Sequence, residues 1–263
     1  MNKTISIDAI TVELVGIEQH FALNEFYQAH RDSEILCESA PNEPQLNGSK
    51  LSLSGESNQG LSLLWQRPDQ SSLSYHLDFV KTAKQLRSFP APKQGAFNQA
   101  LGKKTKTVID ATGGWGGDAL LMCLQGYQVT VIERQGVMAV LLSDAFARLA
   151  KSDWFIDNGV SAPVVINANA FDVLNHQDIK ADCVYLDPMF PAKRKKSAAV
   201  NKQMQLLQEL VGEDADAADV LDSALNNGYA RAAVKRPHYA ESLLRSPDTQ
   251  FSSKLVHYDV YLN

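Results

Sequence analysis

The sequence predicts an α/β protein in which a doubly wound, mostly parallel sheet follows a small β-rich N-terminal domain. Two observations predict the parallel sheet. Apolar, strand-like runs alternate with helical segments from residue 107 onward, and a glycine-rich turn joins the first such run to a helix. A third observation predicts a separate N-terminal part, because the segments before residue 77 lack that alternation. We place the small domain at residues 1–80 and the large domain at residues 81–263.

The N-terminal segment contains short pieces in which apolar and polar residues alternate, such as 5–7 and 51–54. Clusters rich in Asn, Ser, Pro and Gly separate these pieces, at 40–44 and 55–60. This pattern is typical of short strands joined by turns. We find no set of catalytic side chains there, and a proline-containing linker leads to the second domain.

The elements of the large domain follow from the spacing of its apolar residues. Strands are expected at 107–110, 128–133, 163–167, 182–187, 229–235 and 254–262. Helices are expected near 117–125, 136–150, 200–211 and 216–226. Because strands and helices alternate, the helices should cover both faces of the sheet. A ligand should then bind outside the carboxyl ends of the strands.

The first strand of the large domain ends at Asp110 and runs into a glycine cluster that closes at Asp118. The glycines, which allow a ligand to approach the backbone, include Gly114, Gly116 and Gly117. The next strand ends at Glu133, 23 residues after Asp110, where a carboxylate can accept from both hydroxyls of a ribose. The third strand is followed by Asn169 and Ala170, which we expect beside an adenine ring.

Two cofactors are compatible with this unit. The spacing Gly114-x-Gly116-x-x-Ala119 satisfies the dinucleotide fingerprint and would by itself predict NAD. However, the strand ends in an acid, and the loop is longer than a pyrophosphate turn requires. Acids close to the ligand repel a pyrophosphate, but they suit the cationic amino-acid end of S-adenosylmethionine (SAM). SAM is therefore the expected cofactor, with Asp110, Asp118 and Glu133 in its site.

The most informative motif is Asp187-Pro188-Met189-Phe190, which follows the apolar run 183–186. An Asp-Pro turn at a strand end is common turn chemistry. Here the turn also gathers a carboxylate, a backbone carbonyl and an aromatic face, a combination suited to a planar group that carries an NH2. We expect Asp187 and the Pro188 carbonyl to accept the two N–H bonds, and Phe190 to stack on the ring.

Basic residues lie close to this motif in the sequence, although the net charge is −5. A run of four follows the turn directly, and two more come at the end of a later strand: Lys193, Arg194, Lys195, Lys196, Lys235 and Arg236. A basic run is usually a solvated loop. Its position beside a base-sized pocket favours contact with RNA phosphates.

Composition agrees with a soluble enzyme, since 44% of the residues are hydrophobic and 21% are charged. No apolar stretch reaches the length of a membrane helix. The three cysteines, Cys37, Cys123 and Cys183, are far apart and match no metal or disulfide spacing. We therefore expect a cytoplasmic protein without a metal site and without a membrane partner.

Four segments together resemble the RsmJ-type 16S rRNA guanine-N2 methyltransferases. They are residues 110–118, 131–134, 184–191 and 234–240, and the resemblance extends from about residue 77 to the end of the chain. The chain departs from the family at Gly117, where an arginine is usual, at Asn169-Ala170, where a Ser-Ser pair is usual, and over residues 86–92.

The resemblance implies a Rossmann-like SAM-dependent methyltransferase fold. It also implies methylation of the exocyclic N2 amine of one guanosine near the 3′ end of 16S rRNA, as free RNA or in the small ribosomal subunit. The cofactor-binding residues are then Asp110, Gly114, Gly116, Gly117, Asp118, Glu133, Arg134, Asn169, Ala170 and Asp187. The catalytic residues are Asp187, Pro188 and Phe190. The alternatives are methylation of adenine N6 or of a protein glutamine, and a non-catalytic RNA-binding assembly factor.

Overall fold

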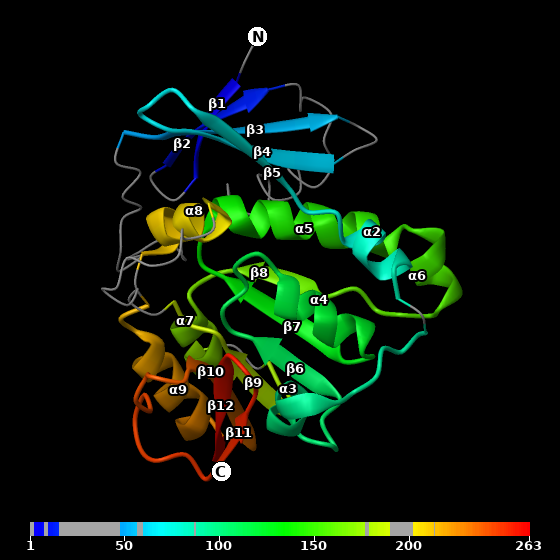
Figure 1. The fold of residues 1–263 in the computed structure, drawn as a ribbon, viewed down its shortest axis with the longest axis vertical. Coiled ribbons are helices and arrows are strands. Elements are labelled where there is room, and N and C mark those ends of the chain that lie inside the picture. Colours follow the sequence, from blue (N-terminus) through cyan, green and yellow to red (C-terminus); the bar gives the residue numbers. More distant parts are fainter. Residues whose placement is uncertain are drawn as a thin grey trace.

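The computed structural model describes residues 3–7, 10–15, 48–56, 60–86, 88–176, 179–189, 202–212 and 214–263. Two sheets organise this part of the chain, and one long helix, α5 (Gly136–Ala150), lies between them (Figure 1). The larger sheet confirms the predicted α/β class, and the smaller one confirms that the N-terminal part is β-rich.

The smaller sheet has the strand order β1-β2-β3-β4-β5. Its strands are β1 (Lys3–Ile7), β2 (Ile10–Val15), β3 (Lys50–Glu56), β4 (Gly60–Gln66) and β5 (Ser72–His76). All neighbours are antiparallel except β2 and β3, which run parallel. Alternate residues of β3 and β4 are buried, namely Leu51, Leu53, Leu61, Leu63 and Trp65. This period of two places one face of the sheet against the rest of the protein.

The larger sheet has the strand order β11-β12-β10-β9-β6-β7-β8. Its parallel strands are β6 (Thr107–Asp110), β7 (Gln128–Glu133), β8 (Val164–Asn167), β9 (Cys183–Leu186) and β10 (Arg231–Pro237). Two antiparallel strands, β11 (Thr249–Ser252) and β12 (Val256–Leu262), complete one edge. Since β6 lies between β7 and β9, the strand order reverses at β6, which is where such sheets bind ligands.

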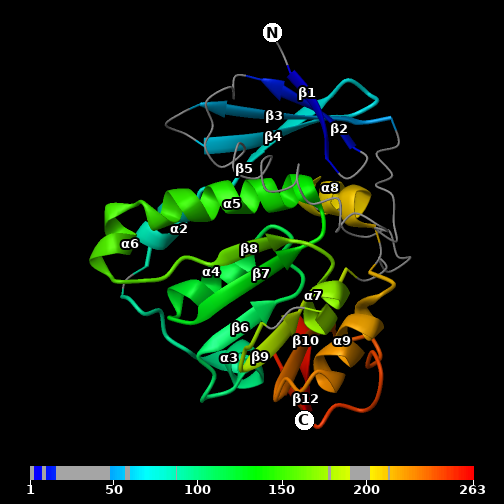
Figure 2. The ribbon, with the colours of Figure 1, turned by 180° about the vertical axis from the view of Figure 1, so that it is seen from behind.

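Helices cover both faces of this sheet. One core cluster joins α3 (Gly95–Leu101), α4 (Gly117–Leu124) and α5 to one face, and a second joins α7 (Ala170–His176) and α9 (Ala217–Asn226) to the other. Neighbouring strand residues divide between them: Tyr185 belongs to the first cluster and Leu186 to the second. Figure 2 shows α7 and α9 side by side. The sheet is thus doubly wound, as the sequence predicts.

The predicted elements of the large domain are all present, with ends within two residues of those expected over the described residues. Five further elements were not predicted: α2 (Phe79–Lys84), α3, α6 (Asp153–Asp157), α7 and β11. Each contains only four to seven residues, which is too short for a helical or alternating pattern to emerge. The remaining helix, α8 (Lys202–Val211), lies beside one end of α5 (Figure 1).

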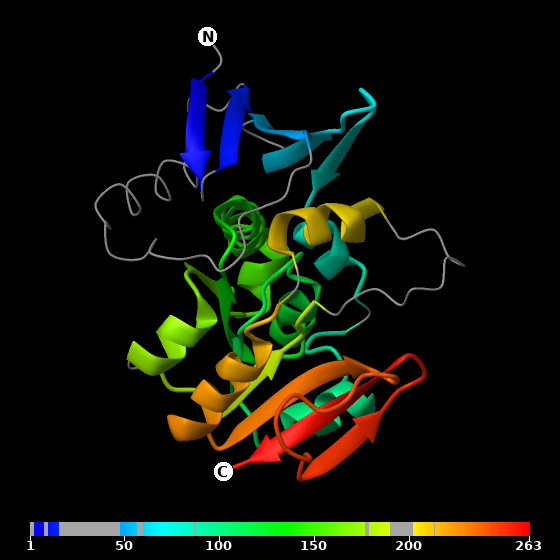
Figure 3. The same cartoon turned by 90° about the vertical axis from the view of Figure 1, so that its left-hand side faces the viewer.

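The two sheets share one hydrophobic core. Figure 3 looks along α5, with the smaller sheet on one side of the helix and the larger sheet on the other. Leucines of β3 and β4 belong to the same cluster as α5 residues such as Leu142 and Phe146. The domain boundary at residue 80 remains a prediction.

Within the described residues, no helix has the length and apolar character needed to cross a membrane. Over the same residues, no group of three or more His, Cys, Asp or Glu side chains is placed to hold a metal ion.

Candidate active site

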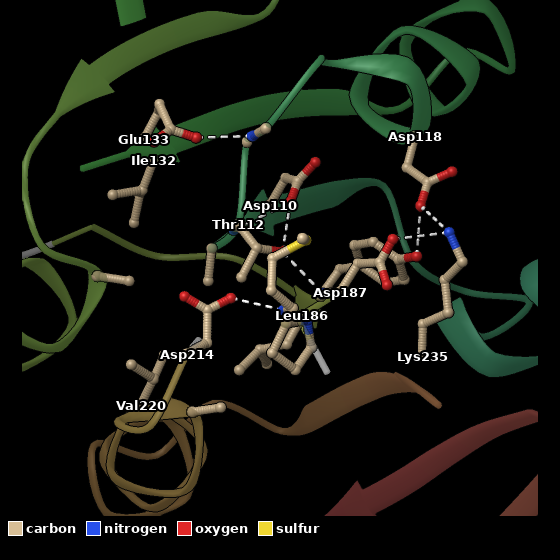
Figure 4. A pocket seen from close by; sticks show the side chains of 18 of the residues that line it. Asp110, Thr112, Asp118, Ile132, Glu133, Leu186, Asp187, Asp214, Val220 and Lys235 are labelled. Atoms are coloured by element: carbon tan, nitrogen blue, oxygen red, sulfur yellow. Dashed lines mark hydrogen bonds and ion pairs between the residues drawn. The ribbon is translucent and has the colours of Figure 1, made fainter. Parts of the chain in front are cut away.

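A cavity of about 470 Å³ lies at the carboxyl ends of the parallel strands. Its size falls within the range of about 300–1,000 Å³ that is typical of small-molecule sites. Figure 4 shows Glu133 on one side, Asp118 and Lys235 on the other, and Asp110, Thr112 and Asp187 between them. All the predicted site residues within the described chain line this cavity: Asp110, Gly114, Gly116, Gly117, Asp118, Glu133, Arg134, Asn169, Ala170, Asp187, Pro188, Lys235 and Arg236.

The glycine loop between β6 and α4 lines the cavity. Gly116 has a φ of +72°, and a Cβ at this position would collide with Leu142 of α5. Only glycine therefore fits where the loop turns into α4. At Gly117 the opposite holds, because a Cβ would meet no atom within 4 Å. A side chain at this position, where the family usually has an arginine, would thus have open space around its Cβ.

The carboxylate of Glu133 holds the glycine loop from β7. One oxygen accepts from the Gly114 N–H at 2.6 Å, and the other accepts from the Gln135 N–H at 2.7 Å. Burial raises the pKa of Glu133 to about 7, although these two hydrogen bonds oppose the shift. Because each carboxylate oxygen has two lone pairs, both can still accept from a ribose hydroxyl.

Asn169 and Ala170 lie where the chain passes from β8 into α7. The Asn169 side chain accepts from the Phe171 N–H at 2.9 Å, so it holds the first turn of α7. Nearby, the Ala168 N–H donates to the Glu133 carbonyl at 3.2 Å. The two segments expected around an adenosine are therefore joined directly.

Arg134 forms ion pairs with Asp214 and with Asp216, the latter at 3.1 Å. Asp214 also accepts from the Met189 N–H at 2.6 Å. Arg134 thus connects the end of β7 to the segment before α9, and Asp214 connects that segment to the Asp-Pro turn. The family resemblance implies that Arg134 binds the cofactor. The structure places it at the cavity wall, with its charge directed at these two acids.

Asp110 is 2% exposed, at the end of β6. Burial, followed by the negative charge of Asp118, raises its pKa to about 8. A cationic ligand would relieve this repulsion, whereas a pyrophosphate would increase it. The donors and acceptors of the cavity therefore fit SAM, whose amino-acid end and sulfonium are positive.

Asp187 follows β9, and its backbone is held on the neighbouring loop. The Asp187 N–H donates to Thr112 Oγ1 at 2.7 Å, and its carboxylate accepts from Lys235 Nζ, also at 2.7 Å. The side chain remains 38% exposed. Burial raises the pKa of Asp187 to about 6, while the positive charge of Lys235 lowers it. The turn thus presents an acid that is fixed but open to the cavity.

Of the six residues expected to bind RNA, the structure describes Lys235 and Arg236, and it places both differently from that expectation. Lys235 points at two carboxylates, and Arg236 is 5% exposed and donates to the Glu241 carbonyl. This geometry does not support phosphate contacts by these two residues. Phe190, Lys193, Arg194, Lys195 and Lys196 lie outside the described residues.

We did not predict Thr112, Asp214 and Asp216, nor the residues that α8 adds to the cavity, which are Met204, Leu207 and Gln208. The sequence carried a partial signal for the acids, because Asp214 and Asp216 directly precede a helix. In the structure, Asp216 at the N-cap makes no side-chain capping hydrogen bond. More acids stand at this helix start than capping uses. Nothing in the sequence placed α8 beside the cavity.

Comparisons with known proteins agree with this geometry. A family model described as "Putative SAM-dependent methyltransferase" matches residues 44–263. Ribosomal RNA small subunit methyltransferase J of Shewanella amazonensis is 37% identical over 240 residues, which cover 85% of this chain and 96% of that protein. The protein of the same name from Vibrio parahaemolyticus is 41% identical over 188 residues, covering 67% and 72%.

A solved structure shows the same likeness over nearly the whole chain. The SAM-dependent methyltransferase from Neisseria gonorrhoeae has a TM-score of 0.63 and 26% identity, over 95% of each chain. The family resemblance and the choice of SAM over NAD are thereby confirmed. The chain therefore belongs to the ribosomal RNA small subunit methyltransferase J family, and it is a SAM-dependent methyltransferase.

Proposed function

We propose that this protein methylates the exocyclic N2 amine of one guanosine in the 16S RNA of the small ribosomal subunit. The observation that carries the proposal is the Asp187 carboxylate, which is fixed by Thr112 and Lys235 yet 38% exposed in the cofactor cavity. The name shared by the relatives supports ribosomal RNA as the substrate. We place the reaction in the cytoplasm, where this RNA would be met.

The chemistry required of the protein is mainly positioning. When bound, SAM supplies a methyl group that is already activated on a positive sulfur. Asp187 and the Pro188 carbonyl accept the two N–H bonds of the amine, which turns the nitrogen lone pair out of the base plane. The amine loses a proton as it is methylated, and Asp187 or water accepts it.

The acceptor base must leave its stack to reach this cavity, because Asp187 and Pro188 line the cavity and a base that is stacked and paired cannot enter it. We assign Phe190 to stacking on the extruded base, since stacking on an aromatic ring contributes about 1–3 kcal/mol per base. Lys193, Arg194, Lys195 and Lys196 follow directly in the sequence, and we assign them to the phosphates around the extruded nucleotide.

The deciding experiment uses tritiated SAM with purified 16S rRNA and with small ribosomal subunits, followed by digestion to nucleosides. We expect the label in N2-methylguanosine from at least one of the two substrates. Label in N6-methyladenosine or in a ribosomal protein would replace the proposed acceptor. No transfer to either substrate would favour a binding role in subunit assembly.

Asp187→Asn separates chemistry from cofactor binding. We expect methyl transfer to fall by about a hundredfold or more, because the amide can accept but has no charge to receive the proton. SAM affinity, measured by calorimetry, should change only a few-fold. Asp172→Asn is the matched control, since Asp172 is exposed on α7 and does not line the cavity. Full activity of Asp187→Asn would exclude the proposed site.

The basic run is tested by its dependence on salt. Replacing Lys193, Arg194, Lys195 and Lys196 by alanine should weaken RNA binding without changing the modified nucleotide, because phosphate contacts do not read the base. The slope of log affinity against log salt should fall by about 0.7 for each lost contact with single-stranded RNA. An unchanged slope in filter binding would mean that these four residues do not contact RNA phosphates and belong to a solvated loop.

A further inference from the structure

Lys235 lies beside Asp187 because of the strand register. Strands β9 and β10 are parallel neighbours, with Val234 paired to Leu186. The two residues that follow this pair, Lys235 on β10 and Asp187 just after β9, are therefore level with each other. No local sequence pattern links them, since 48 residues separate them in the chain.

The lysine is held between two carboxylates. Its Nζ lies 2.7 Å from Asp187 Oδ2 and 2.9 Å from Asp118 Oδ2 (Figure 4). The Tyr185 hydroxyl donates to the same Asp118 oxygen at 2.6 Å. Tyr185 is buried in β9, two residues before Asp187. Asp118, Lys235 and Asp187 thus form a row of two ion pairs, which Tyr185 links to β9.

The charges around Asp187 give the lysine a specific effect. Burial raises the pKa of Asp187, Lys235 lowers it, and the carboxylates of Asp118 and Asp214 raise it. The buried Asp110 carboxylate also repels Asp187. Burial alone would lower the pKa of Lys235, but the Asp187 and Asp118 carboxylates outweigh burial and raise it. Lys235 therefore stays protonated and cannot serve as a base. Its side chain is only 25% exposed, with its charge directed inward at carboxylates.

We propose that Lys235 is a positioning residue, which keeps Asp187 ionised and holds Oδ2 so that Oδ1 faces the acceptor amine. This inference rests on the proposed function, because it concerns the same carboxylate. It assigns Lys235 to the methyl-transfer site, in place of the RNA phosphates.

The first test compares variants whose effects on pH dependence have opposite signs. Lys235→Met removes the cation, so the acidic limb of the single-turnover rate at saturating SAM should move up by about 1–3 pH units. Asp118→Asn removes a neighbouring negative charge, so the same limb should move down. Lys235→Arg keeps the charge and should retain most of the wild-type profile.

At pH 7 we expect Lys235→Met to lose about tenfold or more in the single-turnover rate, with RNA affinity within about twofold of wild type. Lys93→Met is the matched control, because Lys93 is an exposed lysine that packs on Tyr127 outside the cavity. A rate and profile like those of wild type for Lys235→Met would overturn the inference. A loss confined to RNA affinity and its salt slope would also overturn it, in favour of phosphate contact.

The second test needs neither substrate nor cofactor. Carbon-13 NMR of protein labelled at aspartate carboxyls follows the titration of Asp187, whose signal is identified by its loss in Asp187→Asn. The midpoint should rise in Lys235→Met and change little in Lys235→Arg and Lys93→Met. An unshifted midpoint in Lys235→Met would overturn the inference.

The two tests also separate this inference from the proposed function. A shifted midpoint in a protein that methylates no RNA would reject the function but keep the pairing. If Lys235→Met does not fold, as judged by thermal melting, Lys235→Gln, which also removes the positive charge, carries the NMR test with the same expected sign.

Discussion

Glu133 uses the two oxygens of one carboxylate for two backbone segments, the glycine loop at Gly114 and the start of α5 at Gln135. It is 4% exposed, so it is ordered before any ligand arrives. At the scale of the residue, the side chain that we expect to bind the ribose of SAM therefore also shapes the glycine loop. A neutral replacement should affect both roles.

We predict that Glu133→Gln weakens SAM binding by about 1–3 kcal/mol, which is roughly 5- to 150-fold in Kd. The amide has one acceptor oxygen, so its NH2 must face one of the two N–H donors. Calorimetry with SAM measures the change, and Glu241→Gln, at an exposed position, is the control. Equal affinities of wild type and Glu133→Gln would show that the ribose is held elsewhere.

At the scale of the element, α5 joins the two sheets. Its Asp144 accepts from the Leu61 N–H of β4 and from Arg148 Nε, each at 2.9 Å. Arg148 in turn donates to the Leu77 carbonyl at 2.7 Å, just after β5. Asp144 is 2% exposed, so these polar contacts lie inside a shared apolar core. The smaller sheet is thereby attached to the cofactor-binding part through one helix.

We predict that Asp144→Ala lowers the free energy of unfolding by about 2–4 kcal/mol, because the buried Leu61 N–H and the Arg148 Nε–H both lose their acceptor, and among the described residues only the Leu77 carbonyl still accepts from Arg148. Denaturant unfolding followed by circular dichroism should still show one transition, since the apolar core is continuous. Asp157→Ala, on the exposed side of α6, should change stability by about 0.5 kcal/mol or less. Two separate transitions in wild type would mean that the sheets unfold independently.

At the scale of the whole molecule, the cofactor cavity collects negative charge in a protein whose net charge is already −5. Asp110, Glu133 and Asp187 have pKa values raised to about 8, about 7 and about 6. Folding buries these acids, which is the main cause of the raised pKa values, and it also brings negative charges closer together than they are in the unfolded chain. The ligand-free protein should be less stable as these groups ionise, which is a cost of a site built for a cation.

The sign of the pH dependence follows from proton binding. Between the unfolded and folded pKa values the folded state holds more protons, so stability falls as pH rises through the folded values. Burial lowers the pKa of His257, which acts in the opposite direction below about pH 6.5. The acids therefore determine how stability changes with pH between about pH 6.5 and 8.5.

We predict that the melting temperature of the ligand-free protein falls between pH 6.5 and 8.5, and that SAM raises it more at pH 8.5 than at pH 6.5. Asp110→Asn should reduce both effects and stabilise the ligand-free protein by about 1 kcal/mol or more at pH 8.5. The amino group of SAM titrates equally in both proteins, so their difference reports on Asp110. Parallel melting curves for wild type and Asp110→Asn would contradict the raised pKa of Asp110.

The sequence by itself determined the parallel sheet, the glycine loop, Glu133 and the Asp187 turn, because each depends on residues close together in the chain. Alternating strands and helices then oblige their carboxyl ends to meet at one edge. Only the tertiary structure decided which side chains face each other there: Lys235 meets Asp187 through strand register, and Arg134 meets Asp214 across 80 residues. It also decided that the smaller sheet packs on α5. These contacts depend on chain folding over long distances, which no local spacing encodes.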